Sequence, residues 1–83
     1  MAVDYRSLRN LTAREIIGAL ARDGVLYRRQ KGSHQRDQHP DGRRVTVTFH
    51  ASSDTFPIGT LKEMINQAGW TEEDLIRLSL LSR

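Results

Sequence analysis

The chain has 83 residues, a net charge of +3 and no cysteine. A chain of this length buries about 60–65% of its unfolded surface, so we expect residues 1–83 to form one domain with one modest core. Without cysteine, neither a disulfide framework nor a thiolate metal site is available. No apolar run approaches the length that crosses a membrane, so we expect a soluble, cytoplasmic protein without a membrane partner.

The first half of the chain predicts one helix and then a change to strand patterns. Thr12 and Glu15 have the spacing of a capping box, which opens a helix that Gly24 can end. Two strands with a tight connection between them, and then a turn, are predicted at residues 25–30, 33–39 and 40–42. The second strand is polar throughout residues 35–38, so we expect it to contribute little to the core.

The second half of the chain predicts a third strand and two further helices. Val45, Val47 and Phe49 alternate with polar residues, as in a strand with one buried face. Capping-box patterns at residues 60–63 and 71–74 predict a helix and then a last short helix. The order is therefore α-β-β-β-α-α, an antiparallel meander covered by helices on one face.

The positive charge lies in the middle of the chain. Residues 25–50 hold six lysine and arginine residues against two aspartates, whereas residues 1–24 carry a net +1 and residues 51–83 a net −2. Such a region attracts a phosphate-bearing partner, and the helices lack the basic amphipathic face of a membrane-surface protein. Tyr27 is the only aromatic residue in the two basic strands, which favours recognition of the RNA backbone and shape over base stacking.

The motif Lys31-Gly32-Ser33-His34 is the main candidate site in this basic region. An imidazole has an ordinary pKa near 6.5, so His34 could exchange a proton with a ribose hydroxyl near neutral pH. Gly32 permits close approach of the backbone, and Ser33 supplies a further donor for a phosphate oxygen. The alternative is that His34 is simply an exposed polar residue at the start of a strand.

The two other histidines are weaker candidates. His50, at the end of the third strand, is either a second acid or base or a solvated strand-end residue, and His39 beside Pro40 is typical of a turn. No histidine or carboxylate group has the spacing of metal ligands, so we expect neither a metal site nor a cofactor.

Several motifs occur in an order and spacing that resemble the HicA family of toxins, small messenger-RNA-cleaving endonucleases of bacterial toxin–antitoxin pairs. The motifs are Asp23-Gly24 after the first helix, Arg29-Gln30-Lys31-Gly32-Ser33-His34, His39-Pro40-Asp41-Gly42, Val45-Thr46-Val47 with His50, Gly59-Thr60-Leu61, and Gln67-Ala68-Gly69. The resemblance covers about residues 10–75, which would be the core of a single HicA-like domain.

The resemblance implies a fold, a catalytic residue and a partner. The fold would be α+β and similar to the double-stranded-RNA-binding domain (dsRBD-like), α-β-β-β-α, with a three-stranded antiparallel sheet and helices packed on one face. The short C-terminal helix would be an addition to it. The catalytic histidine of the family's Gly-Ser-His segment would be His34, and the partner would be a cognate antitoxin of the HicB family.

We therefore expect the toxin of a type II toxin–antitoxin system, an endoribonuclease that cleaves mRNA without a metal ion. His34 would take a proton from a 2′-hydroxyl, while Lys31, Arg29 and Arg36 would offset charge on the phosphate. One alternative is a non-catalytic RNA-binding domain of dsRBD-like fold that uses the same basic face. Another is an interaction module whose basic strands meet an acidic protein.

Overall fold

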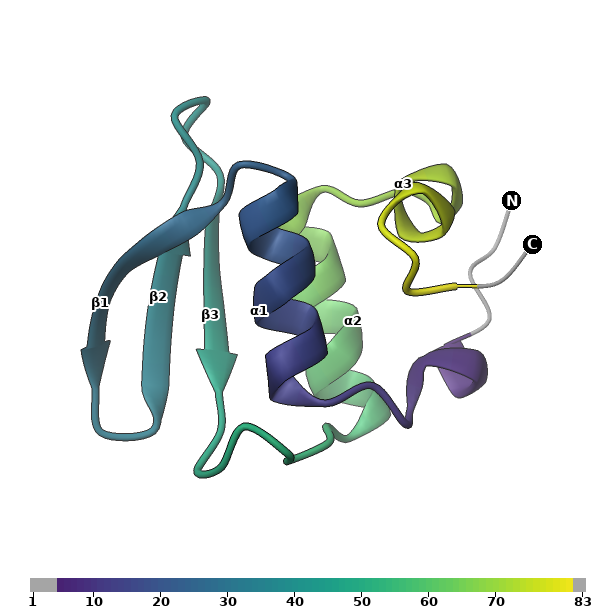
Figure 1. The fold of residues 1–83 in the computed structure, drawn as a ribbon, viewed down its shortest axis with the longest axis horizontal. Coiled ribbons are helices and arrows are strands. Elements are labelled where there is room, and N and C mark those ends of the chain that lie inside the picture. The colour runs from purple at the N-terminus through teal and green to yellow at the C-terminus, as the bar shows by residue number, and fades with distance from the viewer. Residues whose placement is uncertain (1–4, 82–83) are drawn as a thin grey trace.

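The structure is a computed structural model that describes residues 5–81. Its elements in chain order are a 3-10 helix η1 (Tyr5–Leu8), α1 (Ala13–Arg22), β1 (Leu26–Lys31), β2 (His34–Gln38), β3 (Arg44–Thr48), α2 (Ile58–Ala68) and α3 (Glu72–Arg77). Figure 1 shows the three strands side by side, with α1 and α2 packed together next to β3 and with η1 and α3 beyond them. This is the predicted α+β architecture, and η1 is an element that the sequence patterns did not indicate.

The sheet is antiparallel, with the strand order β1-β2-β3. The first two strands each start one residue later than predicted, and Val25, which we expected in the first strand, is instead buried ahead of it. The pairing of β1 with β2 contains a bulge. Tyr27 pairs with Asp37 and Arg29 pairs with Arg36, so Arg28 has no partner residue on β2.

The hydrophobic core lies between β3 and the helices. Val45 and Val47 are buried, as predicted, and Phe49 is half-buried at the margin of the core. The helices contribute Ala13, Ile16, Ala19 and Leu20 from α1, Leu61, Met64, Ile65 and Ala68 from α2, and Leu75 from α3. Every residue of β1 is exposed, so that strand extends beyond the helical layer.

The middle strand β2 supplies no hydrophobic side chain to the core, as expected, but it still buries two polar ones. Gln35 and Asp37 are 7% and 2% exposed, on the same face of the sheet as the buried valines of β3. Gln35 Nε2 donates a 2.9 Å hydrogen bond to Asp37 Oδ1. Burial raises the pKa of Asp37, and the hydrogen bond from Gln35 offsets only part of that effect.

Two of the three predicted capping boxes are confirmed. Thr12 and Thr71 each accept a hydrogen bond from a backbone N–H of their helix, and Glu15 and Asp74 accept one in return. The predicted box at residues 60–63 is wrong. The N-cap is Pro57, three residues before the threonine of that pattern, and the helix begins at Ile58. That threonine therefore lies inside the first turn, where it cannot cap. Within residues 5–81, no helix is both long and apolar enough to cross a membrane.

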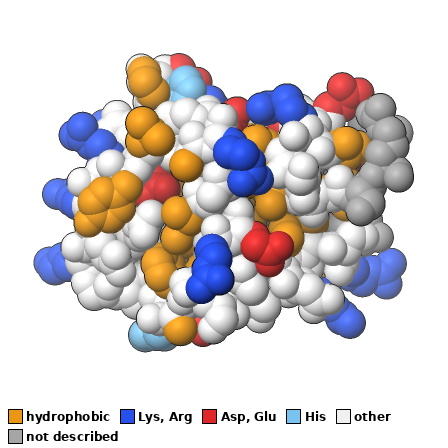
Figure 2. Space-filling model, viewed as in Figure 1, with side chains coloured by type: hydrophobic (Ala, Val, Ile, Leu, Met, Phe, Trp, Pro, Cys, Tyr) orange, Lys and Arg blue, Asp and Glu red, His pale blue; other side chains and the backbone are white. Residues whose placement is uncertain are grey.

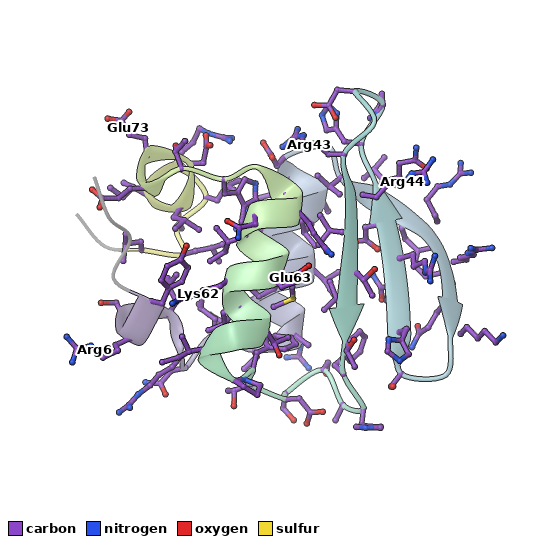
Figure 3. All side chains as sticks on the ribbon, turned by 180° about the vertical axis from the view of Figure 1, so that it is seen from behind. Arg6, Arg43, Arg44, Lys62, Glu63 and Glu73 are labelled. Carbon is purple, nitrogen blue, oxygen red and sulfur yellow. The ribbon has the colours of Figure 1, made fainter. Side chains whose placement is uncertain are left out.

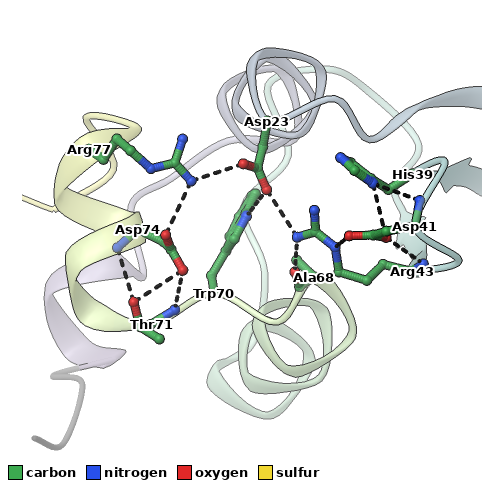
Figure 4. A network of polar contacts seen from close by, with 9 residues as sticks. All are labelled: Asp23, His39, Asp41, Arg43, Ala68, Trp70, Thr71, Asp74 and Arg77. Carbon is green, nitrogen blue, oxygen red and sulfur yellow. Dashed lines mark hydrogen bonds and ion pairs between the residues drawn. The ribbon is translucent and has the colours of Figure 1, made fainter.

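Asp23, directly after α1, is the centre of a polar network (Figure 4). Its Oδ2 accepts hydrogen bonds from Trp70 Nε1 at 2.8 Å and Arg43 Nη1 at 3.1 Å, and its Oδ1 accepts one from Arg77 Nη2 at 2.9 Å. Arg43 also donates to the carbonyl of Ala68 at the end of α2. Burial alone would raise the pKa of Asp23, but the three donors outweigh it and hold the pKa below its ordinary value. The network thus ties the end of α1 to the start of β3 and to the α2–α3 connection.

Candidate functional site

The connection between β1 and β2 is a two-residue turn that brings Lys31 opposite His34. Their Cα atoms are partners in the sheet, and Gly32 between them has φ of 59°. A Cβ atom at Gly32 would meet nothing within 4 Å, so the left-handed backbone conformation, rather than crowding, favours glycine there. This turn therefore holds a cationic side chain and an imidazole next to each other at one end of the sheet.

An open depression of about 570 Å³ lies at this end of the sheet. Its lining residues are Arg29, Lys31, Gly32, Ser33, His34 and Arg36. These are the predicted catalytic residue and the five predicted phosphate-binding residues, whereas His50, the possible second acid or base, is not among them. The depression is therefore bordered by three cations, one imidazole and one hydroxyl, a set of groups that suits a phosphate ester.

His34 is exposed, and its ring is oriented by β3. Its Nδ1 lies 3.1 Å from the Oγ1 of Thr48, the residue that pairs with it across the two strands. Because Nδ1 is engaged, Nε2 is the nitrogen available to a ligand. Thr48 is a residue of this site that the sequence motifs did not indicate. The alternation of β3 placed it on the outward face, but only the register of β2 against β3 brings it to His34.

The basic side chains gather on the face of the sheet that points away from the helices, which we call the outer face. Strand alternation places His34 and Arg36 of β2 there, with Arg29 and Lys31 opposite them on β1. Figure 2 shows lysine and arginine side chains projecting at the strand side of the molecule, while hydrophobic side chains reach the surface between strands and helices.

Arg43 and Arg44 are neighbours in the basic run but point in different directions. Figure 3 shows Arg43 at the helical side of β3 and Arg44 on the side of β2. Arg43 is ion-paired with Asp23 and Asp41, so one of the six cations of residues 25–50 belongs to the network at the end of α1 rather than to the outer face. Its contribution to the basic surface cannot be read from sequence, since the pairing partner Asp23 lies in a distant part of the chain.

The other two histidines are held elsewhere. His50 does not line the depression and lies in the connection after β3, where its backbone N–H and that of Ala51 donate to Asp54 Oδ2. These two bonds lower the pKa of Asp54. His39 lies in the turn between β2 and β3, with its Nδ1 2.9 Å from Asp41 Oδ1. Over residues 5–81, no three histidine and carboxylate side chains cluster as a metal site would require.

Comparison with known proteins identifies the family. No curated protein matches the chain. A family model does match, that of the "HicA toxin of bacterial toxin-antitoxin", over residues 13–70, which run from the start of α1 to Trp70 in the connection between α2 and α3. This range contains the whole sheet and the depression around His34. The chain therefore belongs to the HicA toxin family, and it is a toxin of a toxin–antitoxin system with a cognate antitoxin as its partner.

Proposed function

We propose that this toxin is an endoribonuclease that cleaves mRNA at the depression around His34, with protein side chains alone supplying the chemistry. The observation that carries the proposal is the joint lining of one open depression by an imidazole and three cations. Family membership supports it, since a toxin needs an activity directed at a component of the cell. A charged, solvent-open site fits a large anionic polymer better than it fits a small apolar ligand.

In the proposed reaction, Nε2 of His34 takes the proton of a ribose 2′-hydroxyl. The 2′-oxygen forms a bond to the adjacent phosphorus as the bond from phosphorus to the 5′-oxygen breaks, which leaves a cyclic phosphate and a 5′-hydroxyl end. For this role the Nδ1–H donates to Thr48 Oγ1, so that Nε2 carries the lone pair. The leaving 5′-oxygen requires a proton, and we assign the ammonium group of Lys31 as the proton donor. Lys31 lines the same depression as His34, whereas His50 does not line it.

The remaining side chains bind the phosphate and stabilise the charge that develops on it. Guanidinium groups of Arg29 and Arg36 can each form two parallel hydrogen bonds to phosphoryl oxygens, and Ser33 offers a hydroxyl donor. Donors that are already in place when negative charge accumulates lower the barrier without reorganisation. In this scheme these cations perform the charge stabilisation that a metal ion performs in other nucleases.

The test is cleavage of RNA by the purified toxin in the presence of EDTA. We expect cleavage to continue with the chelator and to fall by about 10² to 10⁴ in the His34→Ala variant, the usual effect of removing one general acid or base. His34 is exposed, so the variant should keep the thermal midpoint of the wild type and its affinity for RNA. Wild-type protein that binds RNA without cutting it would favour the non-catalytic RNA-binding function instead.

A further inference from the structure

A second depression, of about 360 Å³, adjoins the first on the outer face of the sheet. Four arginine side chains line it: Arg28, Arg29, Arg36 and Arg44. Arg29 and Arg36 line both depressions, so the two form one continuous track along β2. Arg28 and Arg44 have no part in the chemistry proposed for His34.

The backbone places these arginines together although they repel one another. Alternation along β2 and β3 turns Arg36 and Arg44 outward, and the bulge at Arg28 adds an extra residue of β1 beside Arg29. Arg29 and Arg36 are directly opposite each other in the sheet, an arrangement of like charges that destabilises a strand pair. An anion bound between them would relieve that repulsion.

None of the four guanidinium groups has a carboxylate partner within residues 5–81. Arg43 and Arg77, in contrast, are both ion-paired with aspartates. Asp37 is the one carboxylate that lines the second depression, and it is 2% exposed, engaged with Gln35 and has a pKa raised by burial. The positive charge of the track is therefore not neutralised by the protein.

We propose that the second depression is a subsite for a neighbouring phosphate of the same RNA strand whose cleaved phosphate lies at His34. This inference rests on the proposed function and names the path of its substrate: the RNA backbone follows β2 from His34 toward Gln38. Residues two apart on one face of a strand are separated by about 6.6 Å, a step that the successive phosphates of an extended strand can match. The lining contains no aromatic residue, so the subsite binds the phosphate and not the base.

The subsite is tested by binding of a 2′-O-methyl RNA oligonucleotide, which cannot be cleaved because its attacking hydroxyls are blocked. We expect Arg44→Gln and Arg28→Gln each to weaken binding about 3- to 10-fold and to reduce the slope of log affinity against log salt by about 0.7, the value for one lost contact to a single strand. Arg9→Gln is the matched control, because Arg9 is an exposed arginine before α1 and outside both depressions.

A second arm locates the phosphate. One backbone phosphate at a time, on either side of a single cleavable ribonucleotide, is replaced by a neutral methylphosphonate. We expect one flanking replacement to raise KM about tenfold in the wild type and to have no further effect in Arg44→Gln, because both changes remove the same contact. If the methylphosphonate and the Arg44→Gln substitution raised KM additively at every position, the subsite would be overturned. It would also be overturned if Arg44→Gln bound RNA normally and lost affinity only for the antitoxin.

The binding and cleavage experiments distinguish a failure of the phosphate subsite from a failure of the endoribonuclease proposal. Absence of cleavage by the wild type would overturn the endoribonuclease proposal, whereas the affinity and the salt slope of the 2′-O-methyl oligonucleotide do not depend on cleavage. Weakened binding in the two arginine variants, with the Arg9→Gln control unchanged, would therefore support the subsite even then. Equal affinities in all three variants and the wild type would overturn it.

Discussion

The Nδ1 atom of His34 lies 3.1 Å from the hydroxyl Oγ1 of Thr48, across the pairing of β2 with β3. This contact fixes the plane of an imidazole that is otherwise exposed to solvent, and it leaves Nε2 for the proton transfer that we propose. In the proposed reaction, Thr48 would therefore be a positioning residue, because it would act on the chemistry only through His34.

We predict that Thr48→Val lowers the cleavage rate constant about 3- to 10-fold, the effect of one hydrogen bond with a net value of about 0.5–1.5 kcal/mol. RNA affinity should be unchanged, since Thr48 does not line either depression. Thr46→Val is the matched control for the rate constant, because Thr46 is on the same face of β3 and pairs with Arg36 rather than with a histidine. Thr46 borders the second depression, so the rate constants are compared at saturating RNA. Single-turnover cleavage by the two variants distinguishes them, and equal rates would remove the positioning role of Thr48.

Charge reversal should show which surface binds RNA. Lys31→Glu removes one cation from the first depression and adds a like charge to the phosphate, so we expect RNA affinity to fall tenfold or more at low salt and less at high salt. Arg9→Glu is the control. Arg77 is unsuited to that purpose, since it donates to both Asp23 and Asp74 and its reversal would disturb the fold. Titrations of labelled RNA at several salt concentrations measure both variants, and equal losses would show that the outer face is not the RNA surface.

Asp23→Asn should destabilise the fold. Asp23 accepts bonds from two guanidinium groups and the Trp70 indole, and hydrogen bonds to charged groups contribute about 1.5–3 kcal/mol. Since the pKa of Asp23 is lowered on folding, its stabilisation is present above its ordinary pKa and is lost as the pH falls through the folded value. We therefore expect the variant to be less stable at pH 7 and the difference to narrow below about pH 4.

Urea unfolding of wild type and variant across this pH range measures the effect. Glu73→Gln removes the same charge from an exposed position on α3, where Figure 3 shows the side chain pointing away from the protein, and it should change stability little. A stability difference for Asp23→Asn that stayed constant down to pH 2 would contradict the assigned role of the carboxylate.

Asp37→Asn should stabilise the fold at neutral pH, in contrast to Asp23→Asn. Burial raises the pKa of Asp37, so at neutral pH the folded protein carries a carboxylate in an unfavourable environment. An amide of the same shape removes that cost. We expect stability at pH 7 to increase by more than about 0.5 kcal/mol, beyond the usual scatter of surface substitutions, and the gain to disappear at acid pH, where the wild-type carboxyl is neutral. A variant less stable than wild type at pH 7 would indicate that the Gln35–Asp37 hydrogen bond needs the charged form.

The cognate antitoxin is expected to cover the outer face. An inhibitor that masks His34 and the basic track would block the surface that we propose for RNA, and an acidic face on the antitoxin would complement that charge and speed association at low salt. Amide hydrogen exchange of the complex should show protection over β1, β2 and the turn at Gly32, and RNA should compete for binding. Protection confined to α2 and α3 would rule out direct masking.

Features set by contacts within four residues were readable in the sequence. The capping pairs Thr12–Glu15 and Thr71–Asp74 each satisfy backbone groups in the same turn of helix, so their pattern specifies the structure without help from the rest of the chain. The pattern at residues 60–63 gave a wrong helix start because a second local signal, Pro57, lies just before it. The helix follows Pro57 and begins at Ile58. The basic character of the middle segment and the candidate His34 were likewise visible, since charge and residue type need no fold.

The tertiary structure decided which of these side chains meet. Arg43 is removed from the basic surface by Asp23, twenty residues earlier in the chain, whereas Arg44 beside it faces outward. The partner of His34 depends on strand register, and a shift of one residue would have turned Thr48 away from it. Composition and periodicity carry no information about such long-range pairings. The sequence alone therefore determined the order of the three strands and three α-helices, the charge and the candidate histidine. Only the strand register and the ion pair of Arg43 with Asp23 decided which cations form a continuous track beside that histidine.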